Sequence, residues 1–320
     1  MTPDVNLRGV WCATLTPLTA DGAPDIARLV AHTKRMFAAG VNGIALFGTT
    51  GEGQSFTVAE RRAALDEMLA AGIEPARIIA ATGCAALPDT IELTRHATRS
   101  GCAGVLIVPP FFFKGVGDAG VFGSYAQVID TVADPRLRLY LYHIPQASGV
   151  PIALDVIQRL VEAYPRTIAG VKDSDGNLAH TRSLLARFPG LAIFVGHEPH
   201  LPAALSAGAA GTICGIANLF PRLIRRLHDH ALADGHHDDL ARVERFIAAV
   251  GGYPLFAAFK AIQADLSGDA AWDALRLPLT ALDSEERRRM LAAVAATGID
   301  FERDAAGPYQ EAPQAARRQL

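Results

Sequence analysis

The chain has 320 residues, half of them hydrophobic, which is enough for one large domain or two smaller ones with a substantial core. Its 30 basic and 33 acidic residues give a formal net charge of −3, so there is no basic surplus for a nucleic-acid backbone or a membrane surface. The composition therefore argues against nucleic-acid and membrane partners and indicates a small-molecule partner.

The cysteines and the first residues indicate a cytoplasmic protein. Four cysteines lie far apart in apolar segments with no CxxC pair, so we expect reduced core residues at Cys12, Cys84, Cys102 and Cys214. The N-terminus has no basic region followed by an apolar one. No stretch approaches the roughly 18 to 20 apolar residues that a membrane span needs.

Short apolar runs alternate along the chain with longer segments of helical period. The runs are bounded by Gly, Pro or Asn and lie at 10–16, 43–47, 77–83, 104–110, 139–145, 168–174, 192–198 and 211–218. Helical segments follow them at 24–39, 57–71, 88–100, 118–132, 153–163, 178–188, 199–207 and 221–233. The second helical segment begins with Thr57-Val58-Ala59-Glu60, which fits a capping box.

Eight such pairs with short connections predict an α/β fold, a (β/α)8 TIM barrel over residues 1–233. The alternative is an open doubly wound sheet, which usually has a Gly-rich turn after its first strand. Here the first run ends in Thr16-Pro17-Leu18 instead. Residues 234–300 are expected to form a helical extension that packs on the barrel or on a partner subunit, with its last helix opened by Asp283. The segment 301–320 is rich in Ala, Pro, Gln and Arg, so we expect a mobile tail.

Polar residues follow several of the predicted strands. Catalytic groups of a barrel gather at the carboxyl ends of its strands. The second run ends in Gly48-Thr49-Thr50-Gly51-Glu52-Gly53, whose hydroxyls and unhindered N–H groups suit a carboxylate. The alternative for this turn is a tight loop that caps the next helix.

Lys172 closes the apolar run Ile168-Ala169-Gly170-Val171. Burial favours the neutral, nucleophilic amine, which makes Lys172 a candidate Schiff-base former. The alternative is a lysine that extends its ammonium group to water. Tyr142 ends the preceding run, so it would lie at the same rim and could exchange protons with a substrate hydroxyl. Tyr142 could equally be an aromatic residue packed at the barrel mouth.

Three motifs in order, 48–52 (Gly-Thr-Thr-Gly-Glu), 141–145 (Leu-Tyr-His-Ile-Pro) and 170–173 (Gly-Val-Lys-Asp), resemble the dihydrodipicolinate synthase and N-acetylneuraminate lyase superfamily. The resemblance implies a class I pyruvate-dependent aldolase or dehydratase without a metal or other cofactor, usually a homotetramer. It implies that Lys172 is the Schiff-base lysine and Tyr142 the proton carrier. The hydroxyls of Thr49 and Thr50 would relay protons and hold the carboxylate of a 2-oxo acid.

The chain departs from the pattern of dihydrodipicolinate synthases at two positions. Ala147 stands where those enzymes have an arginine for the aldehyde carboxylate, and Phe112 stands where they have a relay tyrosine. N-acetylneuraminate lyases carry a Gly-x-Asp-Glu pattern, which here becomes Gly196-His197-Glu198-Pro199. The departures at Ala147 and Phe112 fall on groups specific to lysine biosynthesis, while the residues that the resemblance implies for the 2-oxo acid are intact.

We therefore expect a Schiff-base lyase or synthase acting on a 2-oxo acid and an aldehyde, of the 2-keto-3-deoxy sugar-acid aldolase or dehydratase type. Three alternatives stay open: a 4-hydroxy-tetrahydrodipicolinate synthase, a hydratase-aldolase for an aromatic pyruvate adduct, and a non-catalytic 2-oxo acid binding protein. The expected substrate-binding residues are Gly48, Thr50, Phe112, His143, Ser174, Gly196, Glu198 and Cys214.

A histidine-rich segment beyond the barrel has the composition of a metal site: His228, His230, His236, His237, Asp238 and Asp239. No spacing in it fixes a tetrahedral site. We expect a solvated surface there, and no metal.

Overall fold

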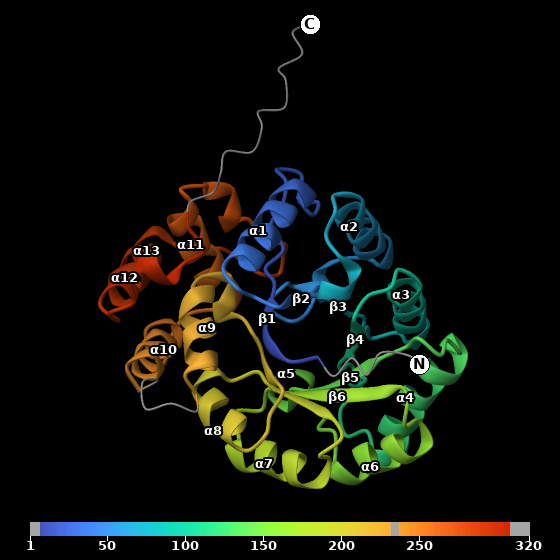
Figure 1. Ribbon diagram of the computed structural model, residues 1–320. Helices are drawn as coiled ribbons and strands as arrows, with labels where there is room; N and C mark the ends of the chain where they lie inside the picture. Colours follow the sequence, from blue (N-terminus) through green and yellow to red (C-terminus); the bar gives the residue numbers. More distant parts are fainter. Residues whose placement is uncertain (1–6, 232–236, 308–320) are drawn as a thin grey trace, which may run out of the picture.

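The computed structural model describes residues 7–231 and 237–307, and it is a closed barrel of eight parallel strands surrounded by helices (Figure 1). The strands are β1 (Gly9–Ala13), β2 (Gly43–Leu46), β3 (Ile78–Ala81), β4 (Gly104–Ile107), β5 (Leu139–His143), β6 (Ile168–Asp173), β7 (Ala192–Val195) and β8 (Gly211–Cys214). Each strand pairs with the next along the chain, and β8 pairs with β1 to close the barrel. The predicted (β/α)8 fold is confirmed.

Glycines at the barrel strands make room for large inward side chains. Tyr140 lies on β5, and its neighbours β4 and β6 present Gly104 and Gly170 beside its ring. A Cβ atom at Gly104 would lie 2.7 Å from the Tyr140 ring, and one at Gly170 would lie 2.1 Å from the Ala192 carbonyl oxygen. Because the interior is packed in this way, the polar groups at the strand ends cannot sink into the barrel and stay at its rim.

Helices follow the strands as the sequence predicts. They are α1 (Ile26–Ala38), α2 (Val58–Ala70), α3 (Leu87–Arg99), α4 (Asp118–Val132), α6 (Leu154–Ala163), α7 (Leu178–Arg187), α8 (Leu201–Ser206) and α9 (Pro221–Asp229). The short helix α5 (Pro145–Ser148) was not predicted. The capping box is confirmed, since the Thr57 hydroxyl accepts from the Glu60 N–H group and the Glu60 carboxylate accepts from the Thr57 N–H group.

The C-terminal helices pack on the barrel beside α1 and α9 (Figure 1). They are α10 (His237–Val250), α11 (Leu255–Ser267), η5 (Ala270–Asp273), α12 (Ser284–Ala295) and α13 (Phe301–Asp304). The His32 ring lies 5.0 Å from the buried Trp272 ring, and Arg28 forms a 2.8 Å ion pair with Asp269. These contacts join the first helix of the barrel to η5 of the extension.

The extension continues past the predicted start of the mobile tail. Helix α13 covers residues assigned to that tail, and its Asp304 is fully buried. The remainder of the predicted tail, 308–320, lies outside the described residues, as does His236. Composition alone placed the start of the tail at residue 301 because it cannot show that the carboxylate of Asp304 is buried.

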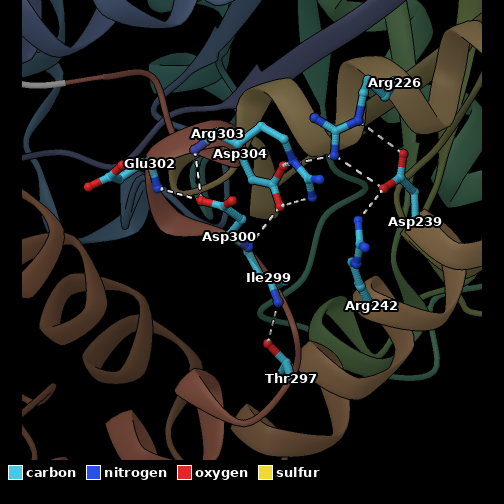
Figure 2. A network of polar contacts seen from close by, with 9 residues as sticks. All are labelled: Arg226, Asp239, Arg242, Thr297, Ile299, Asp300, Glu302, Arg303 and Asp304. Carbon is cyan, nitrogen blue, oxygen red and sulfur yellow. Dashed lines mark hydrogen bonds and ion pairs between the residues drawn. The ribbon is translucent and has the colours of Figure 1, made fainter.

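Asp304 belongs to a network of charged side chains that holds α13 against α9 and α10 (Figure 2). Its carboxylate lies 2.8 Å from a guanidinium nitrogen of Arg226 and 2.8 Å from one of Arg303. Arg226 also pairs with Asp239, which pairs in turn with Arg242. Asp239, a member of the histidine-rich segment, thus serves in this network of ion pairs.

Replacing Asp304 should therefore loosen the extension. Asp304→Ala removes hydrogen bonds to two guanidinium groups, and we expect the free energy of unfolding to fall by about 1–3 kcal/mol in urea denaturation. The matched control is Glu302→Ala, an exposed acidic residue of the same helix, which should change it by less than about 0.5 kcal/mol. Equal effects of the two substitutions would show that the network does not stabilise the fold.

Within residues 7–231 and 237–307, no single helix is long and apolar enough to cross a membrane. Helices α10 and α11 satisfy the length and composition test only together, and the chain bends by 114° between them.

Candidate active site

The turn after β2 has a conformation that only a few residue types tolerate. Phe47 and Glu52 have positive φ angles of 56° and 54°. A Cβ atom at Gly51 would lie 2.6 Å from the Thr14 carbonyl oxygen, and one at Gly53 would lie 1.9 Å from the Phe47 carbonyl oxygen. These close approaches explain why Gly51 and Gly53 follow the predicted hydroxyl pair, Thr49 and Thr50, in this turn.

A buried ion pair fixes the same turn from behind. Lys260 of α11 lies 2.6 Å from the Glu52 carboxylate, both side chains are fully buried, and Lys260 Nζ also donates to the Ala274 carbonyl oxygen at 2.7 Å. Burial raises the pKa of Glu52 and lowers that of Lys260, and each partner's charge opposes the effect of burial on the other. The C-terminal extension therefore supports the turn that carries Thr49 and Thr50.

Lys172 and Tyr142 lie side by side, as predicted from their places at the ends of neighbouring strands. The register of β5 and β6 pairs the two residues directly. Lys172 is 4% exposed, its Nζ lies 4.2 Å from the centre of the Tyr142 ring, and the Tyr142 hydroxyl lies 3.2 Å from the Thr49 hydroxyl. The buried position rules out the alternative in which Lys172 extends into water.

Ser174, Gly196 and Glu198 are also brought close to Lys172. A Cβ atom at Gly196 would lie 1.8 Å from Ser174 Oγ and 3.3 Å from Lys172 Cε, so a side chain there would displace both groups. Ser174 Oγ is buried without a hydrogen-bond partner among the described residues. Glu198 is 7% exposed and accepts from the Ile216 N–H group at 3.3 Å, and burial raises the pKa of its carboxyl group. These groups could hold a polar atom of a substrate bound at Lys172.

Cys214, at the end of β8, is buried close enough to interact electrostatically with Lys172 and Glu198. Its thiol pKa lies well above the ordinary value, first because of burial and second because of the Glu198 charge. A thiol in this state is a small apolar wall rather than a nucleophile. Thr50 closes the same side of the site, since a Cβ atom at Gly215 would lie 3.4 Å from its hydroxyl.

A cavity of about 370 Å³ opens beside Tyr142 and Thr49. Its walls come from four distant parts of the chain: the turn after β2, the ends of β3 and β4, the start of α5, and the C-terminal extension. The apolar residues that line it include Val108, Phe111, Ile144, Ala147, Phe256 and Leu279. The sequence analysis missed most of these residues because apolar side chains in loops carry no chemical signal of their own.

Of the eight predicted substrate-binding residues, Gly48 lines this cavity, and seven do not: Thr50, Phe112, His143, Ser174, Gly196, Glu198 and Cys214. Phe112 is 70% exposed, whereas its neighbour Phe111 turns inward. Lys114 Nζ fixes this loop by donating to the carbonyl oxygens of Phe111 and Ser148. His143 alternates with Tyr142 along β5, so it points away from the barrel interior and its Nδ1 accepts from the Ile152 N–H group at 3.2 Å. Neither Phe112 nor His143 borders the cavity, and their predicted substrate-binding roles stay predictions.

His143 lies instead in a group of metal-type ligands with Asp173, Asp175 and His180, whose ligand atoms lie within 4.8 Å of one another. The group is internally paired: the His180 ring nitrogen and the Thr181 hydroxyl contact the same Asp173 oxygen at 3.1 and 2.7 Å. The hydrogen bond to Asp173 raises the pKa of His180, while burial lowers that of His143. These contacts tie α7 to β5 and β6 behind Lys172.

A buried lysine on the sixth strand of a parallel barrel, next to a tyrosine and a hydroxyl-bearing turn, is the arrangement expected of class I aldolases and lyases. Comparison with known families agrees. The profile of the Dihydrodipicolinate synthetase family matches residues 6–297, and the chain belongs to this family. Its members are class I aldolases and lyases that act through a lysine Schiff base, so the chain is an enzyme of this class. The resemblance inferred from the three motifs is confirmed.

Several relatives match over nearly their whole length. An "Uncharacterized DapA-like lyase" of Chloroflexus aurantiacus is 37% identical over 306 residues, which cover 94% of this chain and 98% of the relative. The 4-hydroxy-tetrahydrodipicolinate synthase 1 of Streptomyces coelicolor is 33% identical, with 90% and 93% covered. The crystal structure of a dihydrodipicolinate synthase from Agrobacterium tumefaciens superposes with a TM-score of 0.85 at 32% identity, with 91% and 99% covered.

A 2-keto-3-deoxygluconate aldolase of Sulfolobus solfataricus has the same fold, with a TM-score of 0.81 at 20% identity and with 90% of this chain and 96% of the other covered. The family is thus shown, and these relatives differ among themselves in the substrate that their names give.

The ion pair between Glu52 and Lys260 should stabilise the turn after β2. Lys260→Met leaves the Glu52 charge buried without a partner, and we expect the free energy of unfolding to fall by about 3–5 kcal/mol in urea denaturation. Adding Glu52→Gln to this variant should recover part of the loss because the buried charge is then removed. Lys34→Met, at an exposed lysine of α1, is the matched control. Unchanged unfolding of the Lys260→Met variant would contradict the role assigned to the pair.

Proposed function

We propose that Lys172 forms a Schiff base with the C2 ketone of pyruvate or a related 2-oxo acid, and that the enzyme makes or breaks the C3–C4 bond of the resulting adduct. The observation that carries this proposal is the geometry of three groups. The Lys172 amine lies over the ring of Tyr142, and the hydroxyl of that tyrosine contacts the hydroxyl of Thr49.

The reaction balances without an oxidant or a reductant. The Lys172 amine adds to C2, the ketone oxygen leaves as water, and the iminium withdraws electrons so that a proton can leave C3. The enamine carbon C3 then attacks the carbonyl carbon of an aldehyde, and Tyr142 gives a proton to the aldehyde oxygen. Water adds at C2 and releases a 4-hydroxy-2-oxo acid together with the free amine. The reverse sequence cleaves such an acid.

The turn after β2 supports a place for the 2-oxo acid carboxylate. Among residues 7–231 and 237–307, no acceptor is found for the N–H groups of Thr50 and Gly51. These donors and the Thr49 hydroxyl lie in a turn whose shape is fixed by glycines and by Glu52. An anion bound there would gain hydrogen bonds without any rearrangement of the backbone.

The candidate activities differ in the second substrate that each would use. A sugar-acid type aldolase or dehydratase draws support from Ser174 and Glu198, whose polar atoms lie near Lys172. A 4-hydroxy-tetrahydrodipicolinate synthase draws support from the Streptomyces coelicolor relative. Against it stands Ala147, a cavity wall that offers no positive charge to an aldehyde carboxylate. A homotetramer without a metal ion is the assembly that the family resemblance supports.

Trapping tests the proposal at a single atom. Incubation with pyruvate and borohydride should reduce the imine and leave a mass increase of one reduced pyruvate on the peptide that contains Lys172. Lys172→Ala should abolish the adduct and lower turnover by several orders of magnitude, because the covalent step is lost.

Lys114→Ala is the matched control, because Lys114 is another lysine near the cavity but donates only to backbone carbonyls. It should be trapped like the wild type. An adduct elsewhere in the chain, or none, would overturn the proposal. An adduct at Lys172 without consumption of any aldehyde would instead support a non-catalytic 2-oxo acid binding protein.

A further inference from the structure

Tyr142 and Thr49, whose hydroxyls contact each other, line the cavity described above. Because the proposed function sets Tyr142 beside the aldehyde oxygen, the rest of the aldehyde would extend into this cavity. Its volume of about 370 Å³ falls within the range of about 300–1,000 Å³ that is usual for small-molecule sites. The chemistry of its walls therefore bears on the second substrate, provided that the proposed function holds.

Charge is the first property of the walls. Among the described residues that line the cavity, none is a lysine, an arginine or a histidine. Glu52 is its acidic member, and this fully buried carboxylate is already paired with Lys260. The nearby Lys114 is held on the carbonyl oxygens of Phe111 and Ser148. An aldehyde with a carboxylate or phosphate group would therefore lose its hydration without gaining a counter-charge.

Hydrogen-bonding capacity is the second property, and much of it is already used. The Gln54 amide donates to the Gly83 carbonyl oxygen at 2.7 Å. The Ser148 hydroxyl donates to the Val150 carbonyl oxygen at 2.8 Å and accepts from the Val150 N–H group at 3.1 Å. The Thr49 and Tyr142 hydroxyls contact each other. Among the described uncharged side chains of the lining, the Ser55 hydroxyl and the Gln54 amide oxygen remain without a hydrogen bond, which is few partners for a sugar-like tail with several hydroxyl groups.

Apolar surface is the third property. Val108 and Phe111 follow β4, Ile144 and Ala147 follow β5, and Phe256 and Leu279 come from the extension. Ser174 and Glu198, which the sequence analysis assigned to a hydroxylated tail, lie near Lys172 but do not line this space. The main favourable interaction that these walls offer is therefore the burial of an apolar group of the substrate.

We infer that the cavity is the aldehyde subsite and that it accepts an uncharged, hydrophobic aldehyde, aromatic or branched aliphatic, so that the condensed product is a 4-hydroxy-2-oxo acid with an apolar tail. This inference rests on the proposed function and adds the class of the second substrate. In the reaction, the C3–C4 bond forms between pyruvate and the aldehyde carbon, and the aldehyde oxygen takes its proton from Tyr142.

The test compares three aldehydes with pyruvate as the common partner. Benzaldehyde is apolar, glyceraldehyde is hydroxylated, and succinic semialdehyde is charged. Pyruvate consumption by the wild-type enzyme should give a kcat/KM for benzaldehyde that exceeds the other two by on the order of tenfold or more. A preference for glyceraldehyde or succinic semialdehyde, or no consumption of any aldehyde, would overturn the inference.

A substitution in the wall tests the same point without relying on the natural substrate. Ala147→Arg places a positive charge in the cavity and should lower kcat/KM for benzaldehyde about tenfold and raise that for succinic semialdehyde about tenfold. Ala147→Met is the matched control: it fills similar space without charge, so it should not raise activity on succinic semialdehyde. Equal responses of the two variants would contradict the inference.

Borohydride trapping of pyruvate in the same samples distinguishes the Schiff-base proposal from the assignment of the aldehyde subsite. Trapping at Lys172 together with a preference for a polar aldehyde would leave the Schiff-base proposal standing and remove only the assignment of the subsite. Failure of trapping at Lys172 would remove both.

Discussion

Closure of eight parallel strands is the constraint on which the rest of the molecule depends. Once β8 pairs with β1, each strand has two neighbours in fixed register, and the carboxyl ends of all strands meet at one rim. That register sets Tyr142 directly beside Lys172 and leaves their sequence neighbours His143 and Asp173 on the outer side. The same alternation therefore separates Lys172 and Tyr142 from the ion pairs that tie α7 to the barrel.

The C-terminal extension completes what the barrel leaves open. Lys260 neutralises the buried Glu52 behind the turn after β2, while Phe256 and Leu279 form part of the cavity wall. The extension thus both supports the turn and forms part of the cavity wall. A buried ion pair is a weak source of net stability, but removing one partner is costly, so such a pair holds the turn in one arrangement.

The sequence predicted the fold and the adjacency of Lys172 and Tyr142 for physical reasons that are local. Apolar runs bounded by turn residues fixed the strands, and a lysine at the end of a β-branched run marked the sixth strand end. The outward direction of His143 is also predictable from the sequence, since a strand period of two turns it away from Tyr142. The sequence does not predict that Phe111, rather than Phe112, turns towards the cavity, because the loop after β4 has no periodic pattern of side-chain directions.

The sequence also does not predict which residues of the extension line the cavity. Phe256 and Leu279 are apolar residues distant in sequence from the barrel motifs, and only the folded chain brings them to Tyr142. The predicted tail begins at residue 301, but the structure has helix α13 there. Composition did not predict this helix because Asp304 is buried through its ion pair with Arg226 of α9, not through hydrophobicity. Residues whose role depends on a distant partner are thus the ones that composition and period do not reveal.

We propose that Lys172 binds the 2-oxo acid covalently while the turn after β2 holds its carboxylate. A crystal structure of the enzyme after exposure to pyruvate would show both contacts at once. We expect continuous density from Lys172 Nζ to C2, the carboxylate against Thr49 and Thr50, and C3 facing the apolar cavity. Pyruvate bound apart from Lys172, or a carboxylate held away from that turn, would contradict it.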